Sequence, residues 1–84
     1  MDTIQLSQKE KAKHLKFCKA MAMTRESYKV PIEKMDGLTT FEVQKIESGR
    51  FLVPQTTTIL LYSLAIEVDF SEFLDKFRAI EATL

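Results

Sequence analysis

Residues 37–50 read Gly-Leu-Thr-Thr-Phe-Glu-Val-Gln-Lys-Ile-Glu-Ser-Gly-Arg, and this stretch carries the strongest local signals in the chain. Thr39 is a favourable N-cap residue. Glu42, three positions later, completes a capping box in which each side chain satisfies a free backbone N–H group. The two glycines tolerate positive φ, so they suit a turn on either side. The stretch therefore predicts a short helix over residues 39–48 between two turns.

Only a narrow apolar stripe runs along this short helix. Val43 and Ile46 lie at positions i and i+3, which share one side of a helix. The other side chains therefore face outward. Because so thin a stripe cannot anchor a central core element, we expect this helix to be displayed on the surface of the domain.

The composition is that of one small folded domain, 1–84. Its hydrophobic content of 45% is ordinary for a globular chain, and the presence of only two glycines and two prolines favours helices joined by short turns. A domain this small buries only about 60% of the surface that its unfolded chain exposes, so association with a second chain would help to stabilise it. We expect residues 1–6 to form a flexible tail.

Cysteine content and hydropathy indicate the compartment. Cys18 is the single cysteine, which argues against a disulfide framework and favours a reducing interior. His14 and Cys18 are four residues apart, a spacing that can bind a metal ion. Because no second pair of ligands accompanies them, we expect both to pack inside the domain and predict no metal or cofactor. No apolar run approaches about 18 residues, so we predict a soluble, cytoplasmic protein without a membrane partner.

The net charge is zero, but the charges are unevenly distributed. Residues 9–50 carry ten Lys or Arg against six Asp or Glu, a balance of +4, and residues 51–84 carry two against five, a balance of −3. The offset favours a molecule with two electrostatic ends, of which the basic one suits a nucleic acid. Ordinary solvated surface is the alternative, and the sequence leaves both open.

Two helices are expected before the displayed one. The Ser-Gln-Lys-Glu capping box at residues 7–10 opens a helix that should end at about Met21 or Met23. Thr24 can then cap a second helix. Pro31 lies within that stretch, and a proline in a helix interior costs about 3 kcal/mol. The stretch is therefore either split, with Pro31 in the first turn of a shorter helix, or kinked.

Two further helices are expected after the displayed one. Pro54 disfavours helical geometry at the residue before it, so residues 50–54 should form an extended link. Apolar spacing predicts a fourth helix over 55–67, and Asp69 can cap a last helix over 70–84. The pattern as a whole predicts an all-α domain with five helices and no strand.

From about residue 15 to residue 74 the chain resembles the phage repressor and Cro (XRE-like) helix-turn-helix family, whose members have five-helix, lambda-repressor-like domains. The first block of the resemblance is residues 37–50, where the family carries a glycine, a Ser/Thr cap, an exposed quartet and Ile-x-x-Ile-Glu-x-Gly. The second block begins at Pro54 and matches the family's Leu-rich helix and capped last helix. Its matching residues are Ile59, Tyr62, Ala65, Ile66, Val68, Phe70, Phe73 and Leu74. The resemblance also implies that a basic residue of the first helix pairs with Glu47, and Lys19 lies nearest to that position.

In this family the displayed helix enters the major groove of double-stranded DNA. The resemblance therefore implies a sequence-specific transcriptional regulator, such as a repressor, with residues 39–48 as the recognition helix. The implied base contacts are Thr40, Phe41, Gln44 and Lys45. The implied phosphate contacts are Thr24, Arg25, Thr39, Ser48 and Arg50.

Domains of this type bind two half-sites as dimers, so the resemblance also implies a homodimer. The expected dimer seam is the apolar edge of the last helix, formed by Phe73, Phe77, Ile80 and Leu84. An alternative is that these aromatic residues close the core of the monomer, which applies more to Phe70, Phe73 and Leu74 than to Ile80 and Leu84.

A protein-interaction module on the same fold, adaptor or antitoxin-like, is the alternative function. The neutral net charge and the place of Phe41 on the displayed helix favour a protein partner. Phe41 is either exposed or folded back onto Leu38 or Phe51, and an exposed phenylalanine is unusual on a surface that binds nothing. An enzyme is not expected, because the chain has one His, one Cys, no glycine-rich phosphate loop and no Ser/His/Asp set.

Overall fold

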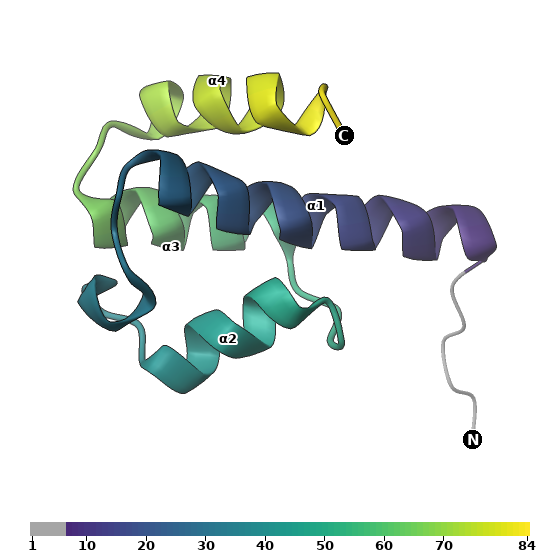
Figure 1. Ribbon diagram of the computed structural model, residues 1–84, viewed down its shortest axis with the longest axis horizontal. Helices are drawn as coiled ribbons and strands as arrows, with labels where there is room; N and C mark the ends of the chain where they lie inside the picture. Colours follow the sequence, from purple (N-terminus) through teal and green to yellow (C-terminus); the bar gives the residue numbers. More distant parts are fainter. Residues whose placement is uncertain (1–6) are drawn as a thin grey trace.

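The computed structural model describes residues 7–84, so the tail predicted at 1–6 lies outside the described residues. Its elements, in chain order, are α1 (Gln8–Ser27), the 3-10 helix η1 (Ile32–Lys34), α2 (Thr40–Ser48), α3 (Gln55–Ile66) and α4 (Phe70–Glu81) (Figure 1). Residues 7–84 contain no strand, which confirms the all-α prediction. The predicted count of five helices is not confirmed, because this part of the chain contains four α-helices and the short 3-10 helix η1. None of the described helices is long and apolar enough to cross a membrane.

The 20-residue helix α1 is the element on which the others pack. Its predicted capping box is formed: Glu10 N donates to Ser7 Oγ at 3.1 Å, and Ser7 N donates to Glu10 Oε1 at 3.0 Å. The helices α2, α3 and α4 all contact α1. In Figure 1, α4 lies above α1 and α2 lies below it, so α2 occupies one edge of the molecule.

The prediction that Thr24 caps a second helix was wrong. α1 continues through Thr24 and ends only at Ser27. The Thr24 side chain is fully buried, and its hydroxyl donates to the Ala20 carbonyl at 2.7 Å. A threonine hydroxyl can bond either to a free N–H group at a helix start or to the carbonyl four residues earlier, so its local sequence does not separate the two positions. Of the two outcomes considered for Pro31, the split is correct: Pro31 immediately precedes η1.

The caps predicted for α2 are confirmed. Glu42 N donates to Thr39 Oγ1 at 3.0 Å, and Thr39 N donates to Glu42 Oε1 at 2.8 Å. Gly49 ends the helix with φ of +75°. This left-handed backbone angle favours glycine, and a Cβ atom at this position would also require the exposed Leu15 side chain to shift, since it would approach that side chain to 2.7 Å.

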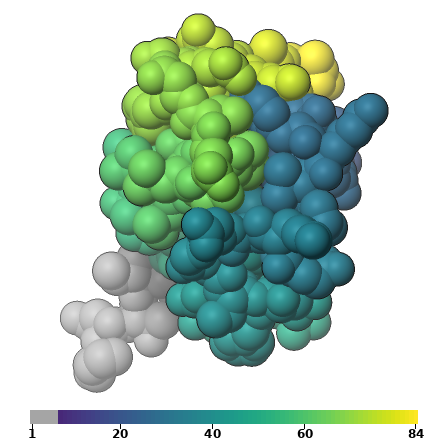
Figure 2. All heavy atoms as spheres, turned by 90° about the vertical axis from the view of Figure 1, so that its left-hand side faces the viewer, coloured from purple at the N-terminus to yellow at the C-terminus, as the bar shows by residue number. Residues whose placement is uncertain are grey.

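The aromatic core lies between α1, α3 and α4. Phe17 meets Phe77 edge to face with ring centroids 5.4 Å apart, and Phe73 packs edge to face against Tyr62 at 6.3 Å. Tyr28, which follows α1, stacks on Phe73 at 6.1 Å. These contacts join the two ends of the sequence, and Figure 2 shows the end of the molecule where the close of α1, the η1 region and the start of α4 meet.

The predicted dimer seam was wrong for its two aromatic residues. Phe73 and Phe77 are 0% and 4% exposed, because α4 turns this face inward onto α1 and α3. Ile80 is partly buried and packs against the same core, whereas Leu84 is exposed. The alternative considered above, closure of the monomer core, describes this face of α4.

The core position of Phe73 has a measurable consequence. Replacing Phe73 with Ala should lower the free energy of unfolding by about 3–5 kcal/mol, because it removes a fully buried ring and leaves a cavity. The matched control Leu84→Ala should change the same quantity by less than about 0.5 kcal/mol. Urea unfolding followed by circular dichroism measures both. Equal effects of the two changes would contradict the assignment of Phe73 to the core.

Candidate nucleic-acid interface

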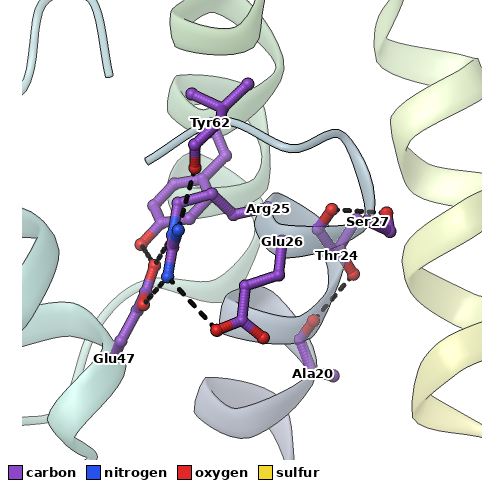
Figure 3. Close-up of polar contacts among 8 residues, drawn as sticks. Ala20, Thr24, Arg25, Glu26, Ser27, Glu47 and Tyr62 are labelled. Atoms are coloured by element: carbon purple, nitrogen blue, oxygen red, sulfur yellow. Dashed lines mark hydrogen bonds and ion pairs between the residues drawn. The ribbon is translucent and has the colours of Figure 1, made fainter. Parts of the chain in front are cut away.

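A buried ion pair fastens the inner side of α2 to the rest of the domain (Figure 3). Arg25, in the last turn of α1, donates from Nε to Glu47 Oε2 at 2.8 Å and from Nη2 to Glu47 Oε1 at 3.0 Å. The Tyr62 hydroxyl of α3 donates to the same Oε2 atom at 2.8 Å. Glu47 therefore joins three helices through one carboxylate, with Arg25 in a two-pronged geometry that a lysine cannot reproduce.

Contacts within the Arg25–Glu47–Tyr62 cluster keep Arg25 charged and Tyr62 neutral. The hydrogen bond to Glu47 raises the pKa of Arg25, so the guanidinium stays charged. Burial raises the pKa of Tyr62, and the neighbouring carboxylate of Glu47 raises that pKa further, so the hydroxyl stays a neutral donor. Arg25 Nη1 also donates to the Val30 carbonyl at 2.8 Å, which holds the chain that follows α1. No buried side-chain nitrogen or oxygen in the described part of the chain lacks a hydrogen-bond partner.

Two of the predicted phosphate contacts do not reach the surface. Thr24 is fully buried, and Arg25 is 7% exposed and paired with Glu47. Both were placed at the start of a second helix, whereas the structure places them inside α1. The partner predicted for Glu47 was also wrong, because Lys19 is exposed on α1 and Arg25 makes the pair instead. The predicted end of the first helix came too early. Because α1 runs to Ser27, Arg25 belongs to this helix and can pair with Glu47.

The outer side of α2 carries all four predicted base contacts in exposed positions. They are Thr40, Phe41, Gln44 and Lys45. Phe41 is 71% exposed, so it is not folded back onto Leu38 or Phe51. Val43 is fully buried and Ile46 partly buried, as the narrow apolar stripe predicts. The helix is therefore divided into an inner side that holds it and an outer side that faces solvent.

A shallow hollow gathers most of the predicted contact residues. It has a volume of about 330 Å³ and lies where α2 meets the link that follows it. Its lining residues are Phe41, Gln44, Lys45, Ser48, Arg50 and Phe51. Thr39 and Thr40, at the other end of α2, are exposed but do not line the hollow.

Phe51 is a member of this surface that was not assigned a contact from the sequence. Lys45 Nζ lies 4.7 Å from the centre of the Phe51 ring, a cation–π distance. His14, buried in α1, donates from Nε2 to the Phe51 carbonyl at 2.8 Å, because a carbonyl oxygen can only accept. Cys18 Sγ lies 3.5 Å from the same His14 nitrogen, and burial raises the pKa of the Cys18 thiol. The His14 hydrogen bond therefore fastens the link after α2 to α1.

Comparisons with known proteins add no relative. No protein-family model matches the chain, and neither a curated protein nor a solved structure matches it. Within residues 7–84, no group of three or more His, Cys, Asp or Glu side chains is placed to hold a metal ion.

The Arg25–Glu47 pair should be a principal determinant of stability. Arg25→Ala leaves the Glu47 carboxylate buried without its cation, so we expect the free energy of unfolding to fall by about 3–5 kcal/mol. The exposed-arginine control, Arg50→Ala, should change it by less than about 0.5 kcal/mol. Tyr62→Phe, which removes one hydrogen bond to a charged group, should cost about 1.5–3 kcal/mol. Urea unfolding curves measure all three, and an Arg25→Ala protein as stable as the unmodified one would contradict this role.

Proposed function

We propose that the protein is a sequence-specific transcriptional regulator of the helix-turn-helix repressor type that binds double-stranded DNA through α2. The observation that carries the proposal is the division of α2 into two sides. Arg25 and Tyr62 hold the inner side at Glu47, while Thr40, Phe41, Gln44 and Lys45 face outward. Reading of bases by a helix requires this arrangement, in which the inner side is fixed to the domain and the outer side is exposed to the DNA.

The size and chemistry of α2 fit a major groove. An α-helix with its side chains is about 10–12 Å in diameter, and the major groove of B-DNA is about 12 Å wide, so the nine-residue α2 can lie in it. Lys45 can donate to guanine O6 and N7, and Gln44 can pair with adenine N6 and N7. Thr40 and Phe41 can contact thymine methyl groups.

Phosphate contacts would set the register of α2 on the duplex. Thr39, Ser48 and Arg50 are exposed at the two ends of the helix and carry N–H or O–H groups suited to phosphate oxygens. Thr24 and Arg25 are excluded from this set by their burial. In this proposal α1 supports α2 directly, and η1 occupies the place where the family has a full helix.

A protein-binding module is the second candidate, and the exposure of Phe41 favours it. A phenylalanine that is 71% exposed and lines the same hollow as Phe51 is suited to an apolar partner as well as to a thymine methyl group. The two functions differ in their dependence on salt, because each phosphate neutralised by Lys or Arg releases counterions.

The first test is a fluorescence-anisotropy titration with mixed-sequence duplex DNA at two salt concentrations. We expect binding that weakens steeply as salt rises, with a log–log slope of about −0.9 for each neutralised phosphate. Absence of binding at low salt would contradict the proposed function and favour the protein-binding module.

The second test separates base reading from phosphate binding. Lys45→Ala should remove a preference of about 1–3 kcal/mol at one base position of a selected DNA site. Arg50→Ala should instead weaken binding to all sequences alike and reduce the salt slope by about 1. Selection of sites from a random-sequence library, repeated with each variant, measures both effects. If neither change alters binding, the outer side of α2 is not the contact surface.

A further inference from the structure

The outer face of α3 is apolar and uncharged. Its leucines Leu60, Leu61 and Leu64 are 44%, 40% and 63% exposed, and with the exposed Thr57 they lie at positions i, i+3, i+4 and i+7 of one side. We call these four residues the α3 face. The 12 residues of α3 include no charged side chain, whereas the exposed side chains of α1, α2 and α4 include many Lys, Arg, Asp and Glu. Leucines grouped in this way on an exposed helix mark an interaction surface.

The apolar surface continues from α3 toward α2. Leu61 also lines a hollow of about 430 Å³, together with the exposed Leu52 of the link after α2. Leu38 and Ile46 line the hollow as well, and the charged Glu42 and Lys45 lie at its α2 side, so a chain that covered the α3 face would find further apolar contact beside it, bordered by charge. The apolar surface available to a partner is therefore larger than the α3 face alone.

The N-terminus of α3 lacks the chemistry that caps the other three α-helices. Ser7, Thr39 and Asp69 each accept a hydrogen bond from a first-turn N–H group of their own helix. α3 begins after Pro54, which provides no side-chain cap, and its first turn contains no acidic residue. The partial positive charge of this helix end is therefore left without a negative partner in its own helix.

The C-terminus of α3 carries a carboxylate where the backbone favours glycine. Glu67 is the C-cap with φ of +65°, a left-handed conformation that a non-glycine L-residue adopts at a cost of about 1–2 kcal/mol. The Glu67 side chain is exposed. The two ends of α3 are thus complementary: the N-terminus has no side-chain cap, and the C-terminus carries an exposed carboxylate.

We infer that the α3 face binds the same face of a second copy of this chain, with the two α3 helices antiparallel about a two-fold axis. The midpoint of Gln55–Ile66 falls between Leu60 and Leu61, and the α3 face is centred on the same point. An axis there sets Leu60 opposite Leu61 of the second copy, and Leu64 opposite Thr57 of the second copy. The seam buries no charge, and it is isologous, as a two-fold dimer requires.

The same axis brings the complementary ends together. Each Glu67 then lies beside the uncapped N-terminus of the other α3, at Pro54 and Gln55, where a negative charge is stabilising. Two features therefore favour a second copy over an unrelated apolar partner. The α3 face is centred on the midpoint of α3, and the two ends of α3 carry complementary charge. This dimer does not require that the protein bind DNA, so the two proposals succeed or fail separately.

The test is the mass in solution, measured by sedimentation equilibrium from about 1 to about 500 μM, a range suited to a seam of modest area. We expect the mass to rise from the 9.7 kDa of one chain to twice that value. Leu60→Lys sets two lysines against the apolar seam and should weaken dimerisation by at least about tenfold. Leu84→Lys, the matched change at an exposed leucine that follows α4, should leave dimerisation unchanged. Circular dichroism checks that both variants remain folded.

Charge changes test the antiparallel register. Glu67→Gln should weaken the dimer by about 3- to 30-fold, because each dimer contains two of these helix-end contacts. Gln55→Glu should make the monomer more stable, since it adds an acid to the first turn of α3, yet it should weaken the dimer by opposing Glu67. Opposite movement of monomer stability and dimer affinity is not expected from a local structural effect. The double change Gln55→Glu with Glu67→Lys should restore the dimer.

Three outcomes would overturn the inference. A mass of 9.7 kDa across the whole concentration range would mean that another partner covers the α3 face. A dimer broken by Leu84→Lys but not by Leu60→Lys would place the seam on α4. A dimer weakened by Leu60→Lys but indifferent to the charge changes at Gln55 and Glu67 would overturn the antiparallel register.

Discussion

One carboxylate, that of Glu47, holds the arrangement of this domain together. Through Arg25 and Tyr62 it joins α1, α2 and α3, and both of its oxygens are occupied. A nine-residue helix is too short to be stable alone in water, so α2 depends on this attachment and on the buried Val43. A buried ion pair is not a strong source of net stability, but its directional bonds tolerate few alternative positions of α2. The cluster therefore sets where the outer side of α2 points.

The remaining faces follow from how the core is filled. Phe17, Phe73 and Phe77 fill the space between α1, α3 and α4, so α4 has no large apolar face left for a partner along its inner edge. The exposed surface includes the outer side of α2, with its aromatic and cationic residues, and the uncharged leucines of α3. These two surfaces meet at the hollow that Lys45, Phe51 and Leu61 share, but their chemistry differs: one suits a charged, hydrogen-bonding ligand, and the other suits an apolar and self-complementary one. A regulator that reads DNA as a pair of subunits would use both.

Most of the candidate site could be located from the sequence, because the residues that start and end α2 lie within α2 or directly beside it. Thr39 and Glu42 satisfy each other's backbone groups within three residues, so their pattern predicts the start of α2 without reference to the rest of the chain. The outward direction of Phe41 and Lys45 then follows from helical spacing. Phe51 was missed as part of the site because its place beside Lys45 depends on the path of an irregular link, which no periodicity describes.

Local chemistry along the chain was enough to specify the all-α class, the start of every α-helix and the displayed position of α2, because caps and apolar spacing act over a few residues. Packing over longer distances settled the rest. Thr24 lies inside α1, where its buried hydroxyl bonds to the Ala20 carbonyl, because α1 continues to Ser27 along the other helices that pack on it. Whether Phe73 faced a second chain or its own core depended on Tyr28 and Tyr62, which lie far from it in the sequence. Each of these outcomes depends on whether a side chain is buried by distant parts of the same chain or left at the surface, and a short stretch of sequence does not contain those distant parts.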